Sequence, residues 1–359
     1  MSGAFDRAGD RDFAGVQAVD PSHGLDVMRL AAWLDTHVEG FVGPLEVSQF
    51  KGGQSNPTYR LTTPGREYVL RRKPPGDLLP SAHAVEREFR VLAAVGAAGI
   101  PAPMVYALCE DREVMGSAFY VMEMVEGRVL WDLSLPDLEP AERRMVVEAQ
   151  VAVLAALHNL DVDTIGLTDF GRPGDYFERQ IARWTRQYRS AETTVIPDME
   201  RLIAWLPVRR PAAGRRAIVH GDYRLDNMVL HPTTSEVRAV LDWELSTVGD
   251  PLADLAWFLM AWILPASERA GFRGMDPVAL GIPSQEDVIT QYAALTGRDG
   301  DIDLDWLMAF TLFRLACIVQ GIAGRVRAGI AKSPHALTAE ARVPLLAAVG
   351  WGCAARAGG

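Results

Sequence analysis

Residues 217–230 read AIVHGDYRLDNMVL, and residues 237–244 read VRAVLDWE. Apolar runs border the polar centre of the first stretch, which predicts two strands with an exposed loop between them. Asp222 and Asn227 lie in that loop, five residues apart. A turn then leads into a third apolar run, and Asp242 follows it. A hairpin of the last two runs would return Asp242 beside Asn227.

These polar residues suit phosphoryl transfer, a reaction whose catalysis rests mostly on positioning and charge neutralisation. A carboxylate such as Asp222 can accept the proton of an attacking hydroxyl. Asn227 and Asp242 offer oxygen ligands, which suit Mg²⁺ because it keeps its remaining positions for phosphate and water.

The section before this stretch is rich in β-type patterns. Short apolar runs separated by turn residues predict five strands, at 47–50, 58–61, 67–72, 104–108 and 118–124. Helical spacing predicts helices at 25–38 and 84–95. After a mobile N-terminus, 1–24, we therefore expect an N-terminal lobe, 25–122, with a five-stranded sheet.

The section that follows changes to long helical patterns. They predict helices at 141–158, 176–189, 252–264, 285–295, 304–325 and 337–349. One short β section, 217–242, interrupts them. The pattern predicts an α+β, bilobal chain, in which a small antiparallel sheet lobe is joined by a hinge, 123–127, to a larger, mainly helical lobe, 128–359. A ligand is expected at the hinge.

The motifs HGDYRLDN and VLDWE resemble those of the aminoglycoside phosphotransferase and choline kinase superfamily, distant relatives of protein kinases. The resemblance implies a protein-kinase-like fold, ATP as the donor and Mg²⁺ as the cofactor. It makes Asp222 the catalytic base and Asn227 and Asp242 the metal ligands. His220 is expected to brace the loop toward the Asp242 segment, and Arg224 is close enough to meet a phosphate or substrate anion, with a surface role as the alternative.

Further acidic residues follow Asp242 closely. Glu244 is a second candidate for a cation, ranked below Asp242. Asp250 and Asp254 are expected to cap a helix and brace a loop, because Asp250 precedes a proline suited to the first helical position. The short spacing leaves no room for a peptide-docking activation loop, which disfavours a protein kinase.

The nucleotide clamp is expected upstream. Residues 51–56 read KGGQSN between two predicted strands, so Gly52, Gly53, Ser55 and Asn56 are expected to bring backbone N–H groups close to phosphate.

One helix of this section carries an acidic residue on its apolar face, Glu88, which needs a cationic partner there, whereas Glu86 is expected to be solvated. Strand alternation puts Arg71 and Lys73 on one face and Arg72 on the other. The expected partner of Glu88 and of the phosphates is Arg71, with Lys73 as the alternative.

Residues 120–127, YVMEMVEG, resemble the linker between kinase lobes. The resemblance implies that backbone groups of Glu123, Met124 and Val125 bind the adenine edge. Met122 is expected to be a core residue.

Composition narrows the class of protein. The 359 residues carry a formal net charge of −10, which argues against a general affinity for nucleic acid. Three widely spaced cysteines show no metal spacing and are expected to be reduced thiols of a cytoplasmic protein. The first 20 residues have no apolar segment typical of a signal peptide, and the longest apolar stretch, 255–264, is shorter than the roughly 20 residues of a membrane span.

The phosphoryl acceptor is predicted from the helix at 176–189. Arg179, Arg183 and Arg186 recur there at helical spacing, with Trp184 and Tyr188. This face suits an anionic, partly apolar small molecule; an exposed amphipathic helix is the alternative.

The motifs GGQSNPTY, SAHAVEREF and GDYRLDNM most resemble a branch of the superfamily found fused to, or associated with, acyl-CoA dehydrogenases. That resemblance implies a hydroxyacyl or acyl-CoA-like acceptor and partners among enzymes of acyl-CoA metabolism. An aminoglycoside or amino-alcohol kinase is one alternative. A catalytically idle nucleotide-binding scaffold is another, which the joint presence of Asp222, Asn227 and Asp242 opposes.

Overall fold

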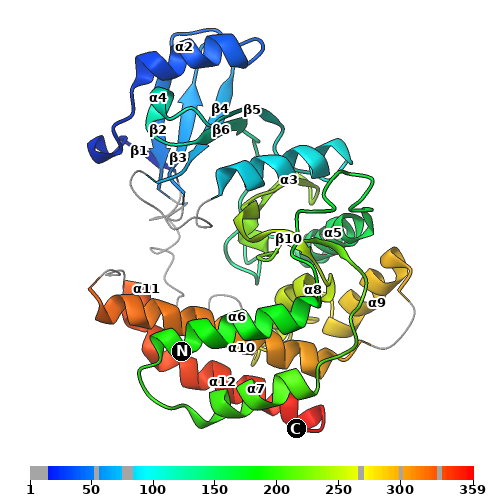
Figure 1. The fold of residues 1–359 in the computed structure, drawn as a ribbon. Helices are drawn as coiled ribbons and strands as arrows, with labels where there is room; N and C mark the ends of the chain where they lie inside the picture. Colours follow the sequence, from blue (N-terminus) through cyan, green and yellow to red (C-terminus); the bar gives the residue numbers. More distant parts are fainter. Residues whose placement is uncertain (1–14, 52–55, 75–83, 266–270, 299–301, 330–333) are drawn as a thin grey trace. The chain divides into compact units, whose positions relative to one another are not determined.

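The computed structural model describes residues 15–51, 56–74, 84–265, 271–298, 302–329 and 334–359. The chain divides into two compact units (Figure 1). Unit 1 comprises Met1–Trp131 and Leu225–Ser246, and unit 2 comprises Asp132–Arg224 and Thr247–Gly359. The segment that carries the motifs therefore passes from unit 2 into unit 1 directly after Arg224.

Unit 1 contains an antiparallel sheet of six strands in the order β1-β2-β3-β4-β6-β5. The strands are β1 (Val16–Gln17), β2 (Glu46–Phe50), β3 (Thr58–Thr62), β4 (Glu67–Arg72), β5 (Val105–Cys109) and β6 (Phe119–Glu123). The five predicted strands are all present. The expectation of five was one too few, because β1 has only two residues and is too short to show an alternating pattern.

Successive residues of strand β4 point to opposite faces of this sheet. Tyr68 and Leu70 join a core cluster with Leu30 and Leu34 of helix α2 (Val27–His37). The short helix α4 (Arg112–Met115) packs against α2. The alternate residue Arg71 turns away from this cluster, toward helix α3 (Val85–Ala97). The sheet therefore has a hydrophobic face under α2 and a polar position facing α3.

The returning segment of unit 1 forms the predicted hairpin. Strands β8 (Met228–Leu230) and β9 (Val237–Val240) pair antiparallel, and the short 3-10 helix η3 (Trp243–Leu245) follows and contacts α3. Residue 127 lies tightly against this hairpin: a Cβ on Gly127 would be 2.1 Å from the carbonyl oxygen of Leu230. Glycine is required there by this close approach of two backbones.

Unit 2 is mainly helical. Its helices are α5 (Pro140–Asn159), α6 (Tyr176–Ala191), α7 (Pro197–Val208), α8 (Leu252–Leu259), α9 (Gln285–Thr296), α10 (Leu304–Arg327), α11 (Pro334–Leu337) and α12 (Ala339–Arg356). Helix α10 packs against α6, α8 and α12, and α7 packs against α12 (Figure 1). By length and composition α10 could cross a membrane, but 72% of its apolar window is buried inside the protein, as in a core helix.

Three predictions for the helical section need correction. Helix α7 was not predicted; prolines near both of its ends, Pro197 and Pro207, mask its apolar spacing, although a proline at the first helical position is a start signal. The single β section at 217–242 is instead two separate pairings, because β7 (Ala217–Val219) pairs with β10 (Thr247–Gly249) in unit 2. The helix predicted at 252–264 ends as an α-helix at Leu259.

Candidate active site

In unit 1 the buried Arg71 forms ion pairs with three carboxylates. The Nε atom of Arg71 lies 2.9 Å from Oε2 of Glu88, and its Nη2 atom lies 2.7 Å from Oδ1 of Asp242 and 3.3 Å from Oε2 of Glu244. The side chains of Arg71 and Glu88 are only 10% and 2% exposed. The predicted Arg71–Glu88 pair is therefore confirmed, and Arg71 also links α3 to the segment after β9.

Glu88 has two further partners. Its Oε1 atom accepts a hydrogen bond of 2.9 Å from the amide of Asn56, and its Oε2 atom accepts one of 3.1 Å from the hydroxyl of Tyr120. Burial raises the pKa of the Glu88 carboxyl to about 7; the cation of Arg71 opposes this rise, and the charges of Asp242 and Glu244 add to it. The ionised state of Glu88 thus depends on Arg71.

Lys73 follows the last residue of β4 and forms an ion pair with Glu86. Glu86 is 29% exposed, as expected for a solvated residue, but the ion pair was not predicted. The alternative that Lys73 is the partner of Glu88 was wrong. Both side chains of the Lys73–Glu86 pair are partly exposed. Arg72, on the opposite face as predicted, donates to the hydroxyl of Ser117 at 2.8 Å.

The two predicted metal ligands lie in unit 1. The N–H of Leu241 donates to the carbonyl of Asn227 at 2.8 Å, so the hairpin does bring Asp242 back beside Asn227. Asp242 has a left-handed backbone, with φ 63° and ψ 61°, a conformation that a non-glycine residue adopts at a cost. Such strain is commonly kept at functional positions.

The donor set of this site fits a hard cation. An amide oxygen and a carboxylate are oxygen ligands, and the Asp242 side chain is 36% exposed and thus open to a ligand. Two oxygen ligands leave positions for phosphate and water, as Mg²⁺ sites commonly do.

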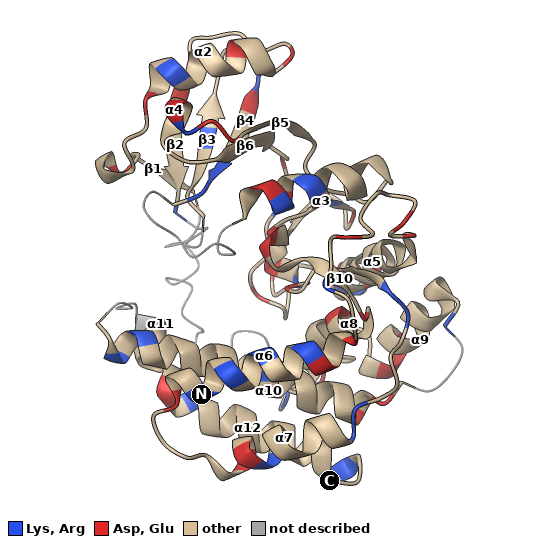
Figure 2. Cartoon of the chain, viewed as in Figure 1, with Lys and Arg blue, Asp and Glu red and all other residues tan. Residues whose placement is uncertain are grey.

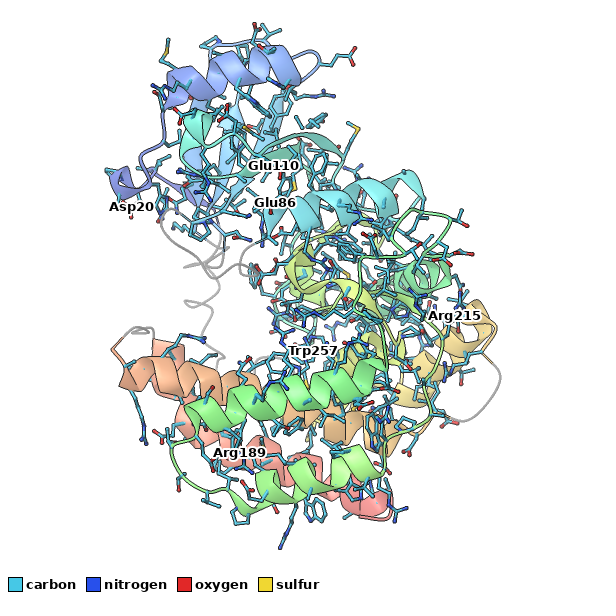
Figure 3. The ribbon with its side chains drawn as sticks, viewed as in Figure 1. Asp20, Glu86, Glu110, Arg189, Arg215 and Trp257 are labelled. Atoms are coloured by element: carbon cyan, nitrogen blue, oxygen red, sulfur yellow. The ribbon has the colours of Figure 1, made fainter. Side chains whose placement is uncertain are left out.

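In unit 2 the loop carries Asp222, whose carboxylate is held at both oxygens. The indole Nε1 of Trp257, labelled in Figure 3, donates to Oδ1 at 3.0 Å. The Nε atom of Arg224 lies 3.3 Å from Oδ2. Gly221, immediately before Asp222, has φ 87°, a conformation that favours glycine.

The backbone of this loop is also fixed. Asp254 of α8 is buried and accepts hydrogen bonds from the N–H groups of His220 (2.6 Å) and Gly221 (2.8 Å). Arg314 of α10 donates to the carbonyl of Gly221 at 2.5 Å. Burial opposes ionisation of Asp254, but its hydrogen bond with His158, the charges of His158 and His220 and the Gly221 N–H together outweigh burial and lower the pKa of Asp254.

Part of the loop bracing predicted from the sequence is present within unit 2. His220 accepts a hydrogen bond from the N–H of Asp222 at its Nδ1 atom, 3.2 Å away, whereas its predicted bridge toward the Asp242 segment stays a prediction. Asp250 accepts from the N–H of Leu252 at 2.9 Å, although α8 begins one residue later than the predicted cap implies. Asp254 holds the loop, as described above.

Two residues at this site were not found from the sequence, Trp257 and Arg314. A signal for each is visible in retrospect. Trp257 follows Asp254 by three residues on one helix, which places both on the same face. Arg314 is a single cation within an apolar helical run, a position that marks a buried charge with a specific role.

The nucleotide-binding predictions fall partly outside the described residues, since Gly52, Gly53 and Ser55 lie in 52–55. The Asn56 side chain is buried against Glu88. The N–H of Glu123 donates to the carbonyl of Met104 at 2.8 Å at the end of β6, so Met124 and Val125 lie beyond the strand pairing. Adenine binding at this linker stays a prediction.

A hollow of about 730 Å³ in unit 1 borders the linker residues Glu123 and Glu126. Its other charged lining residues are Arg66, Glu67 and Arg238. A lining so rich in charge does not resemble the apolar slot that a planar base requires.

Comparisons with known proteins agree with this geometry. A model of the phosphotransferase enzyme family matches residues 46–283, more than half of the chain. Acyl-CoA dehydrogenase family member 10 of Mus musculus is 46% identical over 331 residues, 92% of this chain and 31% of the relative. Acyl-CoA dehydrogenase family member 11 of Homo sapiens is 40% identical over 327 residues, 89% of this chain and 42% of the relative. The chain thus spans less than half the length of these two relatives.

A solved structure resembles the whole fold. The crystal structure of a candidate aminoglycoside phosphotransferase from Ralstonia eutropha is 49% identical, with a TM-score of 0.85, and the match covers 92% of this chain and 98% of that one. The α+β, protein-kinase-like fold predicted from the motifs is confirmed. The chain belongs to the phosphotransferase enzyme family, the aminoglycoside-phosphotransferase type of ATP-dependent kinase.

Proposed function

We propose that this chain transfers the γ-phosphoryl group of ATP to a hydroxyl of a small acyl molecule, a hydroxyacyl or acyl-CoA-like acceptor. The observation that carries the proposal is the fixed position of Asp222, whose Oδ1 atom accepts from Trp257 while Asp254 holds the loop backbone. A carboxylate held in this way can serve as a base without first being ordered by the substrate.

The residues divide the proposed reaction between them. Asp222 accepts the proton of the acceptor hydroxyl as its oxygen forms a bond to the γ-phosphorus. The bond from the γ-phosphorus to the bridging oxygen breaks, and ADP leaves. Arg71, fixed by Glu88, presents a permanent cation to the phosphates, and its planar guanidinium can bind carboxylate and phosphate oxygens together.

Mg²⁺ would be held by Asn227 and Asp242. When bound, it neutralises charge on the β- and γ-phosphates. Arg71 contributes to this site before any ligand arrives, because its contact with Oδ1 of Asp242 fixes one of the two carboxylate oxygens.

The acyl acceptor is supported by the relatives, which are named as acyl-CoA dehydrogenase family members. We extend this to partners among enzymes of acyl-CoA metabolism. An aminoglycoside or amino-alcohol acceptor is the second candidate, and the Ralstonia eutropha structure favours it by its description. The basic residues along α6, visible in Figure 2, oppose a polycationic acceptor near that helix. Cys109, Cys317 and Cys353 are free and buried, and we keep the proposal of a reducing, cytoplasmic setting.

The test is ATP turnover by the purified chain with a hydroxyacyl-CoA, the matching free hydroxy acid, an amino alcohol and an aminoglycoside. We expect ADP release to be stimulated by the acyl acceptors and to be lost in Asp222→Ala, with Mg-ATP binding retained by calorimetry. Stimulation by the aminoglycoside alone would overturn the acyl acceptor. Full turnover in Asp222→Ala would remove Asp222 from its role, and Mg-ATP binding without turnover on any acceptor would favour the scaffold.

A further inference from the structure

The environment of Arg314 in unit 2 is unusual for a cation. Arg314 is 5% exposed, and its guanidinium lies over two indole rings. It is 4.4 Å from the ring centroid of Trp257 and 5.6 Å from that of Trp184. It donates one hydrogen bond, to the carbonyl of Gly221, whereas its Nε atom is buried without a hydrogen-bond partner. In the part of the chain that the structure describes, no carboxylate lies within ion-pair distance of it.

A buried guanidinium without an anion is costly, because burial removes its water and aromatic faces replace only part of that stabilisation. Asp254 of α8 is a candidate for a counter-charge, because it contacts the same loop as Arg314. Its two carboxylate oxygens, however, accept from the His220 and Gly221 N–H groups, and one of them also lies 3.4 Å from His158. Arg314 is therefore held in place by stacking and one neutral acceptor.

A second arginine lies against the ring of Trp184. Arg183 of α6 is exposed, and its guanidinium is 5.0 Å from the centroid of Trp184. Its neighbours on the helix differ from it: Arg179 donates to the carbonyls of the preceding loop at Pro173 and Gly174, and Tyr188 is buried. The structure thus keeps Arg183 with Trp184 and separates both from Arg179 and Tyr188 of the predicted basic, aromatic face. Arg186 of that face is exposed and, among the described residues, stacks on neither indole ring.

The two arginines affect each other electrostatically. Loss of water around the packed guanidinium, together with the charge of Arg314, lowers the pKa of Arg183. Like charges at one ring repel, and a bound anion between them would relieve the repulsion. Arg224, 50% exposed, adds positive charge 3.3 Å from Oδ2 of Asp222.

We propose that Arg183 and Arg314, packed on Trp184 and Trp257, form an acceptor subsite that binds an anionic group of the substrate beside Asp222. The connection to the chemistry is direct, because Trp257 touches both Arg314 and the carboxylate of Asp222. Both indole rings are largely buried and hold the guanidinium groups in position. This inference rests on the proposed function and narrows it to a hydroxyl compound that carries a carboxylate or phosphate.

The experiment compares four acceptors: a hydroxyacyl-CoA, the free hydroxy acid, its uncharged methyl ester and an aminoglycoside. For the wild-type chain we expect kcat/KM for at least one anionic acceptor to exceed that for the ester by about tenfold or more, as for a hydrogen bond to a charged group. Preference for the free acid would identify a carboxylate as the bound anion. Preference for the thioester would identify the phosphates of CoA.

Variants then locate the anion. Arg183→Gln should raise KM for the anionic acceptor about tenfold and leave kcat, KM for ATP and KM for the ester unchanged. Arg183→Lys should recover part of the loss. Arg186→Gln, an exposed arginine one turn further along α6, is the matched control and should behave as wild type. Arg314→Lys should also raise KM for the anion, with a thermal melt to establish that the variant is folded.

The inference is wrong if Arg183→Gln and Arg186→Gln give the same KM, or if the ester is as good an acceptor as the anions. Calorimetric binding of the acceptors without ATP separates this outcome from failure of the proposed function. If no acceptor is phosphorylated, the proposed function fails, and the titrations still decide the subsite: weaker anion binding in Arg183→Gln supports it, and equal binding in both variants overturns it.

Discussion

The indole Nε1 of Trp257 donates a hydrogen bond of 3.0 Å to Oδ1 of Asp222. Trp257 lies three residues after Asp254, which holds the backbone of the same loop at His220 and Gly221. Helix α8 thus fixes both the main chain before the proposed base and the side chain of the base itself. Oδ1 accepts from the indole and Oδ2 lies 3.3 Å from the Nε atom of Arg224, so both oxygens of the proposed base are held.

Replacing Trp257 by phenylalanine should reduce kcat about tenfold or more, since a hydrogen bond to a charged group is worth about 1.5–3 kcal/mol. KM for ATP should be unchanged. Steady-state kinetics measure both. Trp262→Phe is the matched control, because that indole also donates one hydrogen bond, to the carbonyl of Pro283 at 3.1 Å, away from Asp222. Equal kcat values in the two variants would contradict a positioning role for Trp257.

Removing the cation of Arg71 should destabilise the fold. Arg71→Met leaves Glu88 buried with Asp242 and Glu244 nearby, and breaking a buried ion pair in this way costs about 3–5 kcal/mol. Lys73→Met is the control on the same face of β4; its pair with Glu86 is partly exposed and is worth about 0–1 kcal/mol. Urea unfolding of both variants gives the comparison, and similar losses would show that the Arg71 cluster is not specially stabilising.

The titration of Glu88 should appear in the pH dependence of stability. Its pKa in the folded chain is raised to about 7 from the usual value of 4.5, so between these values the folded state binds more protons than the unfolded state. Its contribution to the free energy of unfolding therefore falls as pH rises from about 4.5 to 7, by on the order of 2–3 kcal/mol.

Glu88→Gln cannot titrate and should flatten this slope in urea unfolding measured at pH 5, 6 and 7.5. Glu86→Gln, on the same helix and partly exposed, should retain the wild-type slope. An unchanged slope in Glu88→Gln would mean that Arg71 keeps Glu88 ionised throughout this range.

Asp242 and Glu244 both contact Arg71. Comparing variants of the two therefore distinguishes the loss of a metal ligand from the loss of an ion-pair partner. Asp242→Asn should raise the Mg²⁺ concentration for half-maximal activity by about tenfold or more, because it removes a charged ligand. Glu244→Gln also loses a contact with Arg71, at 3.3 Å, but should shift the Mg²⁺ requirement less. Activity titrated with Mg²⁺ after treatment with a chelator gives both values. A larger shift in Glu244→Gln would reverse the two assignments.

The sequence by itself determined the features that depend on local pattern. The period of apolar residues located the five main strands of unit 1, and the bounds of β4 agree with the predicted 67–72. The polarity of Glu88 on an apolar helix face required a cation, and strand alternation selected Arg71 over Arg72. The spacing from Asp222 to Asn227 and Asp242 indicated phosphoryl transfer, because that chemistry needs these groups in a fixed order along one loop and hairpin.

Only the tertiary structure decided which distant residues serve that loop. Trp257 is 35 residues from Asp222, and Arg314 is 93 residues from Gly221, so neither contact has a local pattern from which it could be predicted. The same limit explains the pairing of β10 with β7 and the contact of Lys73 with Glu86. Periodicity reports which face of an element is buried, whereas the identity of the partner depends on packing between elements far apart in the chain.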